Sequence, residues 1–433
     1  MKRKKKIILS ISAIILAIII ALGIYFYPFG RYLLHQIEIS EALPENMYSE
    51  IPFKYGRDNH FQIDCRINKD HHVTLSIDTK ATCLMRTDSI LKYGGQFWGE
   101  LPIKWSNAYN VKYDSNIYSF QSIRFGEMEV TTPLFMETCK DNLIYDVVAD
   151  GVFGVDLLKM GCWKFDTEAK KIKLFHCKNQ AIIDKETEGL VKISNGLEDD
   201  SISIHIGNIP NDFHFTLDLG YSGAIEINNK TTDLLKQKYE HQQINILRKD
   251  GMKDTITIFE NIPISIAGIK IDSCQLVNMR SIDGNYIGAK FMQNFNFLLM
   301  YERKEHNPKH LYLQKRSGDA KGYRQNTISK FGLNLEAMDG KTVVTSLLKD
   351  GAAEKAGVRF GDEILQIEGM TKEQLTSGDI SRNFQQDVDS LEQLKITIKD
   401  KGINNTSTQL ETNENPKKVH SNYCIMMYRK VSV

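Results

Sequence analysis

The sequence predicts a mainly β protein with one N-terminal transmembrane helix, in which two related β-rich halves are followed by a smaller β module. Three observations lead to this prediction. Short stretches of alternating apolar residues, broken by Gly and Asn, fill most of the chain after residue 52. Two of these stretches resemble each other, and each ends at one Asp followed by small or hydroxylated residues. An uncharged apolar run directly follows a basic N-terminus.

The composition fits a multi-domain globular protein. A chain of 433 residues that is 42% hydrophobic can form two or three domains with ample core. The 55 Lys and Arg residues balance the 54 Asp and Glu residues, so the total charge predicts no nucleic-acid-binding surface. The seven cysteines show no zinc-ligand spacing, and we therefore expect no metal site and no cofactor. Cys162 and Cys177 flank a predicted hairpin closely enough to form a disulfide, although small buried thiols are the default expectation.

The N-terminal 30 residues are predicted to be a membrane anchor. Ile7 to Tyr27 contains no charged residue, and as a helix this run is about 31 Å long, enough to cross a bilayer. Aromatic residues at its end suit a membrane interface: Tyr25, Tyr27 and Phe29. The alternative is a cleaved secretory signal, whose apolar core is usually shorter. By the positive-inside rule the basic tip stays cytoplasmic and the bulk of the chain is exported, to the periplasmic or extracellular side.

Composition shifts set the remaining boundaries. Residues 31–52 carry scattered glutamates and are predicted to be a plain juxtamembrane tether. Residues 316–328 are charged and contain glycine, as a linker does. The predicted units are therefore the anchor (1–30), the connector (31–52), the first lobe (53–178), the second lobe (195–315), the linker (316–328) and the C-terminal module (329–433).

Two features recur in both lobes in the same order. The first is a strand that ends at an Asp, VTLSIDTKAT around Asp78 and FHFTLDLGYSG around Asp218. The second is a hydrophobic-hydrophobic-Gly segment, which ends at Gly154 and Gly288. These glycines lie 76 and 70 residues after the respective Asp. Such matching order indicates an internal duplication.

Accessory elements match as well. A short helix is expected after each Asp, over residues 88–93 and 231–239. A closing hairpin is expected at the end of each lobe, over residues 163–175 and 297–313.

This arrangement resembles the aspartic proteases, both the two-lobed pepsin-like enzymes and the retropepsin-like ones, over about residues 57–315. The resemblance implies a two-lobed β fold in which Asp78 and Asp218 form a catalytic pair. Two neighbouring carboxyl groups share one proton, so that one activates water while the other donates to the peptide carbonyl. The resemblance also implies loops that support the pair, with these residues: Thr79, Gly220, Ser222, Gly154 and Gly288.

The sequence departs from the family pattern at two positions. The family has Asp-Thr/Ser-Gly, in which the second-position hydroxyl braces one lobe against the other. Thr79 keeps this hydroxyl, whereas Leu219 lacks it. Lys80 replaces the glycine and places a cation beside the shared proton, which favours the ionised carboxylates. A single Asp at a strand end also commonly accepts turn hydrogen bonds, which is the structural alternative to catalysis.

A substrate-covering hairpin is expected between the two features of the first lobe. The candidate segment is residues 98–113, which contains Trp105, Tyr109 and Tyr113. In pepsin-like relatives a flap tyrosine serves there, but no motif selects one of these aromatic residues, and each also suits a core position.

The C-terminal module closely resembles a PDZ domain through FGLNL at residues 331–335 and AGVRFGDEILQIEG at residues 356–369. The resemblance implies a loop that binds a peptide carboxylate, formed by Phe331, Gly332, Leu333, Asn334 and Leu335. A groove helix is expected near residues 380–394, a polar loop over 399–422 and a final strand over 423–428. PDZ-like grooves bind a peptide C-terminus or an extended strand. The alternative is a packing module with a closed groove.

These observations predict a membrane-anchored aspartic endopeptidase that hydrolyses polypeptide substrates and whose PDZ-like module binds substrate or partner peptide ends. The alternative is a catalytically inactive peptide-binding protein that retains the protease fold.

Overall fold

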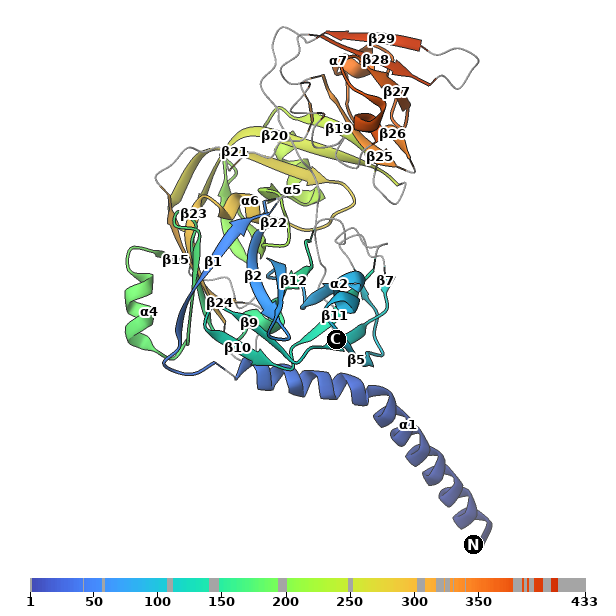
Figure 1. The fold of residues 1–433 in the computed structure, drawn as a ribbon, viewed down its shortest axis with the longest axis vertical. Helices are drawn as coiled ribbons and strands as arrows, with labels where there is room; N and C mark the ends of the chain where they lie inside the picture. Colours follow the sequence, from blue (N-terminus) through green and yellow to red (C-terminus); the bar gives the residue numbers. More distant parts are fainter. Residues whose placement is uncertain are drawn as a thin grey trace.

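The computed structural model of this protein consists of an N-terminal helix, a large β body and a C-terminal β module (Figure 1). It is mainly β, as the sequence predicts. The structure describes these residues: 2–41, 43–56, 59–106, 112–139, 148–193, 201–247, 252–301, 308–316, 323, 328–329, 331–338, 340–376, 384, 388, 393–399 and 406–411.

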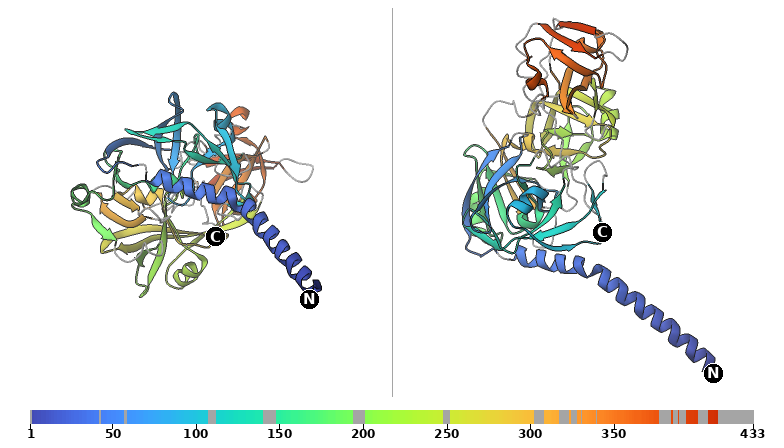
Figure 2. Two further views of the ribbon diagram at one scale, coloured as in Figure 1. Left: turned by 90° about the horizontal axis from the view of Figure 1, so that it is seen from below. Right: turned by 45° about the vertical axis from the view of Figure 1, so that its right-hand side comes forward.

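Helix α1 (Lys2–Ser40) is longer than the predicted anchor. Its segment Ile15–Ile39 is long and apolar enough to cross a membrane. Pro28 lies inside the helix, and proline bends helices because it removes a backbone donor. Figures 1 and 2 show the bend, after which α1 runs along the β body. Much of the predicted plain tether over residues 31–52 is therefore structured, since α1 continues through Ser40 and β1 begins at Tyr48.

We call residues 48–187 the first half of the body. Its strands follow the expected alternation: in the strand before Asp78, for example, Val73, Leu75 and Ile77 are buried. Its elements are β1 (Tyr48–Tyr55), β2 (Phe61–Ile67), β3 (His71–Ile77), β4 (Leu84–Arg86), α2 (Thr87–Lys92), β5 (Gln96–Glu100), β6 (Trp105–Ser106), β7 (Lys112–Tyr113), β8 (Asn116–Ser119), β9 (Ser122–Phe125), β10 (Met128–Thr131), β11 (Leu134–Thr138), β12 (Gly151–Phe153), α3 (Val155–Leu158), β13 (Cys162–Asp166), β14 (Lys171–Phe175) and α4 (Gln180–Thr187).

We call residues 191–315 the second half. In its strand before Asp218, Phe213, Phe215 and Leu217 are buried, and the residues between them are more exposed. Its elements are β15 (Val191–Ile193), β16 (Ile202–Ile206), β17 (Asp212–Asp218), β18 (Ile225–Glu226), α5 (Asn229–Lys236), β19 (Gln242–Leu247), β20 (Lys253–Ile266), β21 (Ile269–Met279), β22 (Tyr286–Gly288), α6 (Ala289–Met292), β23 (Phe295–Tyr301) and β24 (Pro308–Lys315).

The two halves repeat one topology around their Asp-bearing strands. In the first half, β12 pairs parallel to β3 and antiparallel to β4, and β4 pairs parallel to β11. In the second half, β22 pairs parallel to β17 and antiparallel to β18, and β18 pairs parallel to β21. The short helices α2 and α5 follow the Asp strands in both halves, as the sequence predicts.

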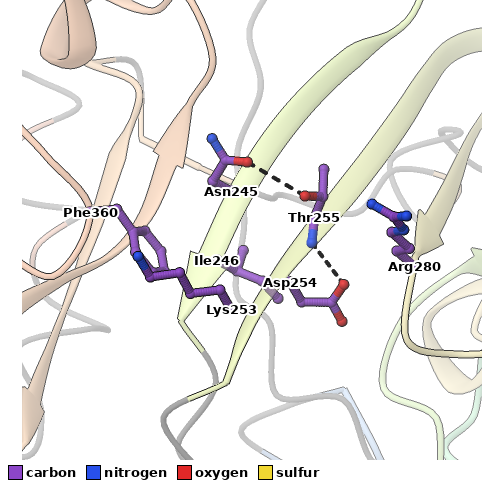
Figure 3. Close-up of a pocket in the computed structure, with 7 residues that line it drawn as sticks. All are labelled: Asn245, Ile246, Lys253, Asp254, Thr255, Arg280 and Phe360. Atoms are coloured by element: carbon purple, nitrogen blue, oxygen red, sulfur yellow. Dashed lines mark hydrogen bonds between the residues drawn. The ribbon is translucent and has the colours of Figure 1, made fainter.

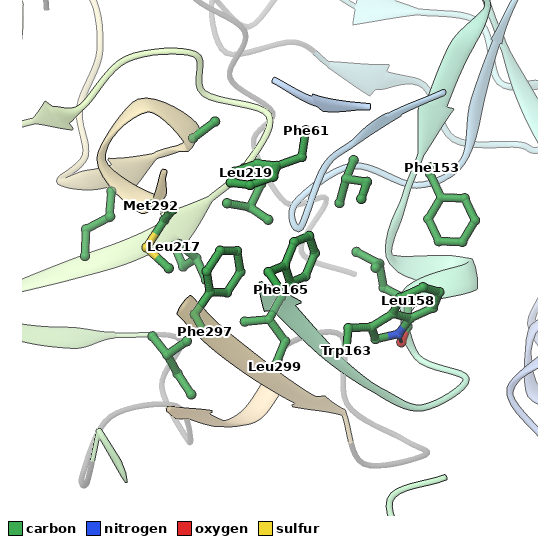
Figure 4. Close-up of a cluster of buried hydrophobic side chains, with 14 of the residues drawn as sticks. Phe61, Phe153, Leu158, Trp163, Phe165, Leu217, Leu219, Met292, Phe297 and Leu299 are labelled. Atoms are coloured by element: carbon green, nitrogen blue, oxygen red, sulfur yellow. Dashed lines mark hydrogen bonds between the residues drawn. The ribbon is translucent and has the colours of Figure 1, made fainter. Parts of the chain in front are cut away.

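The halves are joined by a shared sheet in which the equivalent hairpin strands β13 and β23 pair antiparallel. Phe165 and Phe297 are partners in this pairing, and their rings stack with centroids 4.3 Å apart. Direct antiparallel pairing of equivalent strands is what a two-fold relation between the halves requires. Figure 4 shows the continuous core beside it, to which both halves contribute. The two Asp strands are thus fixed on one scaffold.

A disulfide joins Cys162 to Cys177 across the hairpin of β13 and β14, which the hairpin spacing permits although buried free thiols were the default expectation. Among the described residues, the free cysteines are Cys65, Cys83, Cys139 and Cys274. The Cβ atoms of paired antiparallel strands lie close enough for this bond.

The C-terminal module has its own core, built around residues such as Phe331, Leu333 and Ile364. Its elements are β25 (Leu333–Met338), β26 (Lys341–Leu348), α7 (Ala352–Lys355), β27 (Glu363–Ile367), α8 (Lys372–Thr376), β28 (Gln393–Ile398) and β29 (Thr406–Glu411). Its sheet continues into the second half, because the end of β26 pairs antiparallel with β19. The sequence does not predict this connection.

One prediction for the module was wrong. Residues 399–422 were expected to form a polar loop, yet Thr406–Glu411 is strand β29, paired along its length with β28. The backbone of β28 orders this edge strand although it contains only one large apolar residue, Leu410. The final strand expected over 423–428 lies outside the described residues. Of the expected groove helix, the structure describes Phe384 and Val388 as helical and buried, and its last two residues belong to β28.

Candidate active site

Asp78 and Asp218 end equivalent strands and make equivalent hydrogen bonds. Asp78 Oδ1 accepts from the backbone N–H groups of Lys80 (2.7 Å) and Ala81 (2.9 Å). Asp218 Oδ1 accepts from those of Gly220 (2.9 Å) and Tyr221 (3.2 Å). One oxygen of each carboxyl group therefore shapes its own turn, as an Asp in a turn commonly does.

The second oxygens behave differently. Oδ2 of Asp78 and Oδ2 of Asp218 are both buried without a hydrogen-bond partner. The two side chains are 1% and 0% exposed. Buried carboxyl oxygens normally find donors, so two at one place indicate chemistry or a shared proton.

Thr79 joins the two Asp turns. Its hydroxyl donates to the carbonyl of Leu217 (3.1 Å) and accepts from the N–H of Leu219 (3.1 Å). The sequence predicts this brace across the halves and also predicts that it is one-sided. Leu219, at the equivalent position of the second half, has no hydroxyl and so makes no matching hydrogen bond to the first half. Its side chain is buried in the core.

Gly220 brings the second turn against the first carboxyl group. A Cβ on Gly220 would lie 2.0 Å from Asp78 Oδ2, so only glycine permits this approach. Its carbonyl lies 2.9 Å from His60 Nε2, which must donate because a carbonyl only accepts. Burial lowers the pKa of His60 to about 4, so this ring is neutral at pH 7.

The hydrophobic-hydrophobic-Gly segments lie directly against the turns. Val155 N–H donates to Ala81 O (2.8 Å), and Ala289 N–H makes the equivalent bond to Tyr221 O (2.7 Å). A Cβ on Gly154 would lie 2.4 Å from Ala81 O, and one on Gly288 would lie 2.5 Å from Tyr221 O. The segments therefore fix the positions of both turns.

The structure thus brings together Asp78, Thr79, Asp218, Gly220, Gly154 and Gly288, and places Ser222, also buried, in the second turn. Of the flap candidates, Trp105 and Tyr113 pair across β6 and β7 with ring centroids 4.8 Å apart. Tyr109 lies outside the described residues.

Burial raises the pKa of both carboxyl groups, and the charge of Asp78 further raises that of Asp218. The Lys80 ammonium opposes these shifts in both cases, as its position in the sequence predicts. The two groups interact, so their protons belong to the pair. A pair that holds one proton above pH 4 is the electrostatic state that a carboxylate dyad needs.

The raised pKa values predict a pH-dependent stability. The protonated pair is favoured in the folded state, so its stabilising effect is full below about pH 4 and is lost as the pH rises through the folded values. Burial raises the pKa of Asp78 from 3.8 to about 6, so for this group the loss falls mainly between about pH 4 and pH 6. Asp78→Asn should therefore gain stability relative to the wild type between pH 4 and pH 7, measured by urea unfolding. Asp233→Asn, at an exposed position of α5, is the control, and a constant difference across this range for Asp78→Asn would contradict the assignment.

Sequence reasoning missed three contributors. His60 precedes a strand without any motif. Tyr32, whose hydroxyl donates to Asp156 Oδ2 (3.2 Å), belongs to helix α1, whose apolar sequence gives no sign of this contact. Glu226 on β18 is fully buried, accepts from Tyr221 Oη (3.0 Å) and from the N–H of Met279, and burial raises its pKa to about 8. The sequence feature that could have pointed to Glu226 is an acidic residue within a short apolar strand.

Both carboxyl groups are buried in this structure. A cavity of about 420 Å³ lies elsewhere, between the second half and the C-terminal module (Figure 3). It is lined by Asn245, Ile246, Lys253, Asp254, Thr255, Arg280 and Phe360. Among the described residues, no group of three or more His, Cys, Asp or Glu side chains is placed to hold a metal ion.

The C-terminal module carries the second candidate site. Gly332 has φ +78°, a left-handed conformation that favours glycine, and it begins the turn into β25. Among the described strands, β25 pairs only with β26. Residues 323–399 match the family described as PDZ domain. This part of the chain is a PDZ domain. PDZ domains bind peptide C-termini or extended strands, by adding a strand to a sheet edge.

The PDZ domain buries Phe331, Leu333 and Leu335 in its core. Asn334, within the same predicted loop, is half-buried, and its Oδ1 accepts from Ser329 N–H (3.2 Å). A search of curated proteins found no match to the chain.

Proposed function

We propose that this protein is a membrane-anchored aspartic endopeptidase. The observation that carries the proposal is the contact of two equivalent Asp turns on one scaffold, with Asp78 Oδ2 and Asp218 Oδ2 buried and without partners. Carboxyl groups kept partly protonated by burial and by each other supply both a base and an acid.

In the proposed reaction, the ionised member of the Asp78/Asp218 pair accepts a proton from water, which attacks the peptide carbonyl. The protonated member donates to the carbonyl oxygen, and the pair returns a proton to the leaving amine. Thr79 and the loops at Gly154 and Gly288 hold the turns in place. Because both carboxyl groups are buried here, the proposal requires their cover to open for substrate.

PDZ domains bind peptide ends, and we propose that this one presents substrate tails or partners to the body. Support comes from the sheet that runs from β26 into β19, which fixes the domain on the second half. The basic residues before the apolar run favour a cytoplasmic tip and an exported body.

The test is cleavage of an unfolded, fluorescently labelled polypeptide by the full chain in detergent between pH 3 and pH 7, with and without pepstatin. We expect pepstatin-sensitive turnover that falls as the pH rises above the pKa of the pair. Lys80→Gly should extend turnover to higher pH, because it removes the cation that favours the ionised pair.

The second candidate is a peptide-binding protein without catalysis. The specific observations in its favour are the one-sided brace at Leu219 and the complete burial of both carboxyl groups. Absence of turnover at every pH, together with retained binding of C-terminal peptides, would establish this alternative.

A further inference from the structure

The part of α1 after Pro28 packs on the first half of the body. Four of its residues face the body at the i, i+3, i+4, i+7 spacing of one helix face: Tyr32, His35, Gln36 and Ile39. Nε2 of His35 lies 2.7 Å from Thr132 O, and Gln36 and Ile39 are buried. The Arg31 guanidinium lies 4.4 Å from the ring centroid of Trp98 on β5. This segment therefore belongs to the folded body.

Tyr32 reaches the turn that follows Asp78. Its hydroxyl donates to Asp156 Oδ2 (3.2 Å) and lies 2.9 Å from Thr82 Oγ1. The same Asp156 oxygen accepts from Thr82 Oγ1 and from the N–H of Cys83 (2.9 Å). Asp156 lies in the first turn of α3, two residues after Gly154. The membrane helix thus supports the carboxylate that ties the Asp78 turn to the Gly154 loop.

The second half holds its turn differently. The residue two positions after Gly288 is Lys290, where the first half has Asp156. Lys290 N–H donates to Gly223 O (3.2 Å) within the same half. Support from α1 is thus a property of the first half, and the internal duplication does not account for it.

The opposite face of the same segment is apolar and exposed. Leu33, Leu34 and Ile37 are 41%, 65% and 51% exposed and form one stripe. The apolar run that precedes Pro28 is exposed as well, for example at Ile24 and Tyr27. Large aliphatic side chains are unfavourable in water, and a membrane surface is one place where an exposed apolar helix face becomes buried.

We propose that residues 29–39 of α1 form a membrane-surface helix that seats the body on lipid through Leu33, Leu34 and Ile37 and secures the Asp78 turn through Tyr32. The occupant of the stripe is the phospholipid bilayer, because Ile7 to Tyr27, directly before it on the same helix, is an uncharged apolar run long enough to cross one. The bilayer and the candidate site are then connected through one helix. This inference concerns membrane seating and turn rigidity and holds whether or not the site is catalytic.

The lipid contact is tested with one added tryptophan in full chain reconstituted into phosphatidylcholine vesicles with brominated acyl chains. Bromine quenches the fluorescence of a nearby indole, so Leu34→Trp should gain emission over the wild type in ordinary lipid and lose most of that gain in brominated lipid. Leu91→Trp is the matched control, since Leu91 is 77% exposed on α2 in the first half. Equal emission of Leu34→Trp in both lipids would overturn the membrane-surface helix.

The stabilisation of the Asp78 turn by Tyr32 is tested by hydrogen exchange of the amides over residues 81–83, followed by mass spectrometry. Tyr32→Phe removes the hydroxyl and keeps the ring, so exchange there should become about tenfold faster, whereas amides of the PDZ domain should not change. Tyr27→Phe is the control, because Tyr27 lies on the same helix and is 67% exposed. Unchanged exchange in Tyr32→Phe would overturn the positioning role. Neither readout depends on peptide hydrolysis by this protein, so a failure of the proposed function can be told apart from a failure of this inference.

Discussion

In the proposed reaction, Asp218→Asn is expected to lower the rate of peptide hydrolysis by about a thousandfold. Asparagine has nearly the shape of aspartate but can neither hold nor transfer the shared proton, and proton transfer by a positioned group contributes about 10²–10⁴-fold. Asp78→Asn should cause a loss of similar size, because the two carboxyl groups act as one pair. The measurement is kcat/KM for a labelled unfolded polypeptide at the pH of maximal turnover.

The double variant separates a pair from two independent groups. When residues act as a unit, removing the second costs little once the first is gone. Asp78→Asn with Asp218→Asn should therefore be about as slow as either single variant. Asp233→Asn should keep wild-type turnover, since this side chain is exposed on α5. Losses that multiply in the double variant, or turnover that survives either single change, would remove the dyad from the mechanism.

The local features of the repeat could be predicted from sequence because they depend on short-range patterns. Alternating apolar residues predicted β3 and β17. The Asp that ends each strand accepts hydrogen bonds from the backbone of the turn that follows it. The hairpin of β13 and β14 placed Cys162 opposite the strand that ends near Cys177. The single hydroxyl brace was implied by the resemblance to the aspartic proteases, because Thr79 keeps the family's hydroxyl and Leu219 does not.

Contacts between distant segments could not be predicted in this way. His60 hydrogen-bonds to Gly220, which is far away in sequence, and no local pattern predicts that the two halves fold against each other. The same holds for Tyr32, which reads as part of an apolar helix until the fold places Asp156 beside it. Strand β29 was missed because its pairing with β28, rather than its own apolar content, orders it. Burial of both carboxyl groups is likewise a property of the assembled body.

Gly220→Ala is expected to destabilise the protein by about 3 kcal/mol, which tests the contact between the two turns. The new Cβ would lie 2.0 Å from Oδ2 and 2.3 Å from Cγ of Asp78, so the carboxyl group or the turn must shift. Overpacking of this kind costs about 1–3 kcal/mol or more. Gly99→Ala is the matched control, because a Cβ on this glycine of β5 meets nothing within 4 Å. The measurement is the free energy of unfolding in urea.

A double-mutant cycle with Asp78→Ala makes this test specific. The three nearest neighbours of the new Cβ are all atoms of the Asp78 carboxyl group, so truncating that side chain removes the obstruction. Gly220→Ala should then cost less than about 1 kcal/mol in the Asp78→Ala background, which gives a coupling energy of about 2 kcal/mol between the two positions. A cost that stays the same in both backgrounds would mean that Gly220 is required by its own turn alone. The two turns would then not meet as described, and the proposed pair would lose its geometric basis.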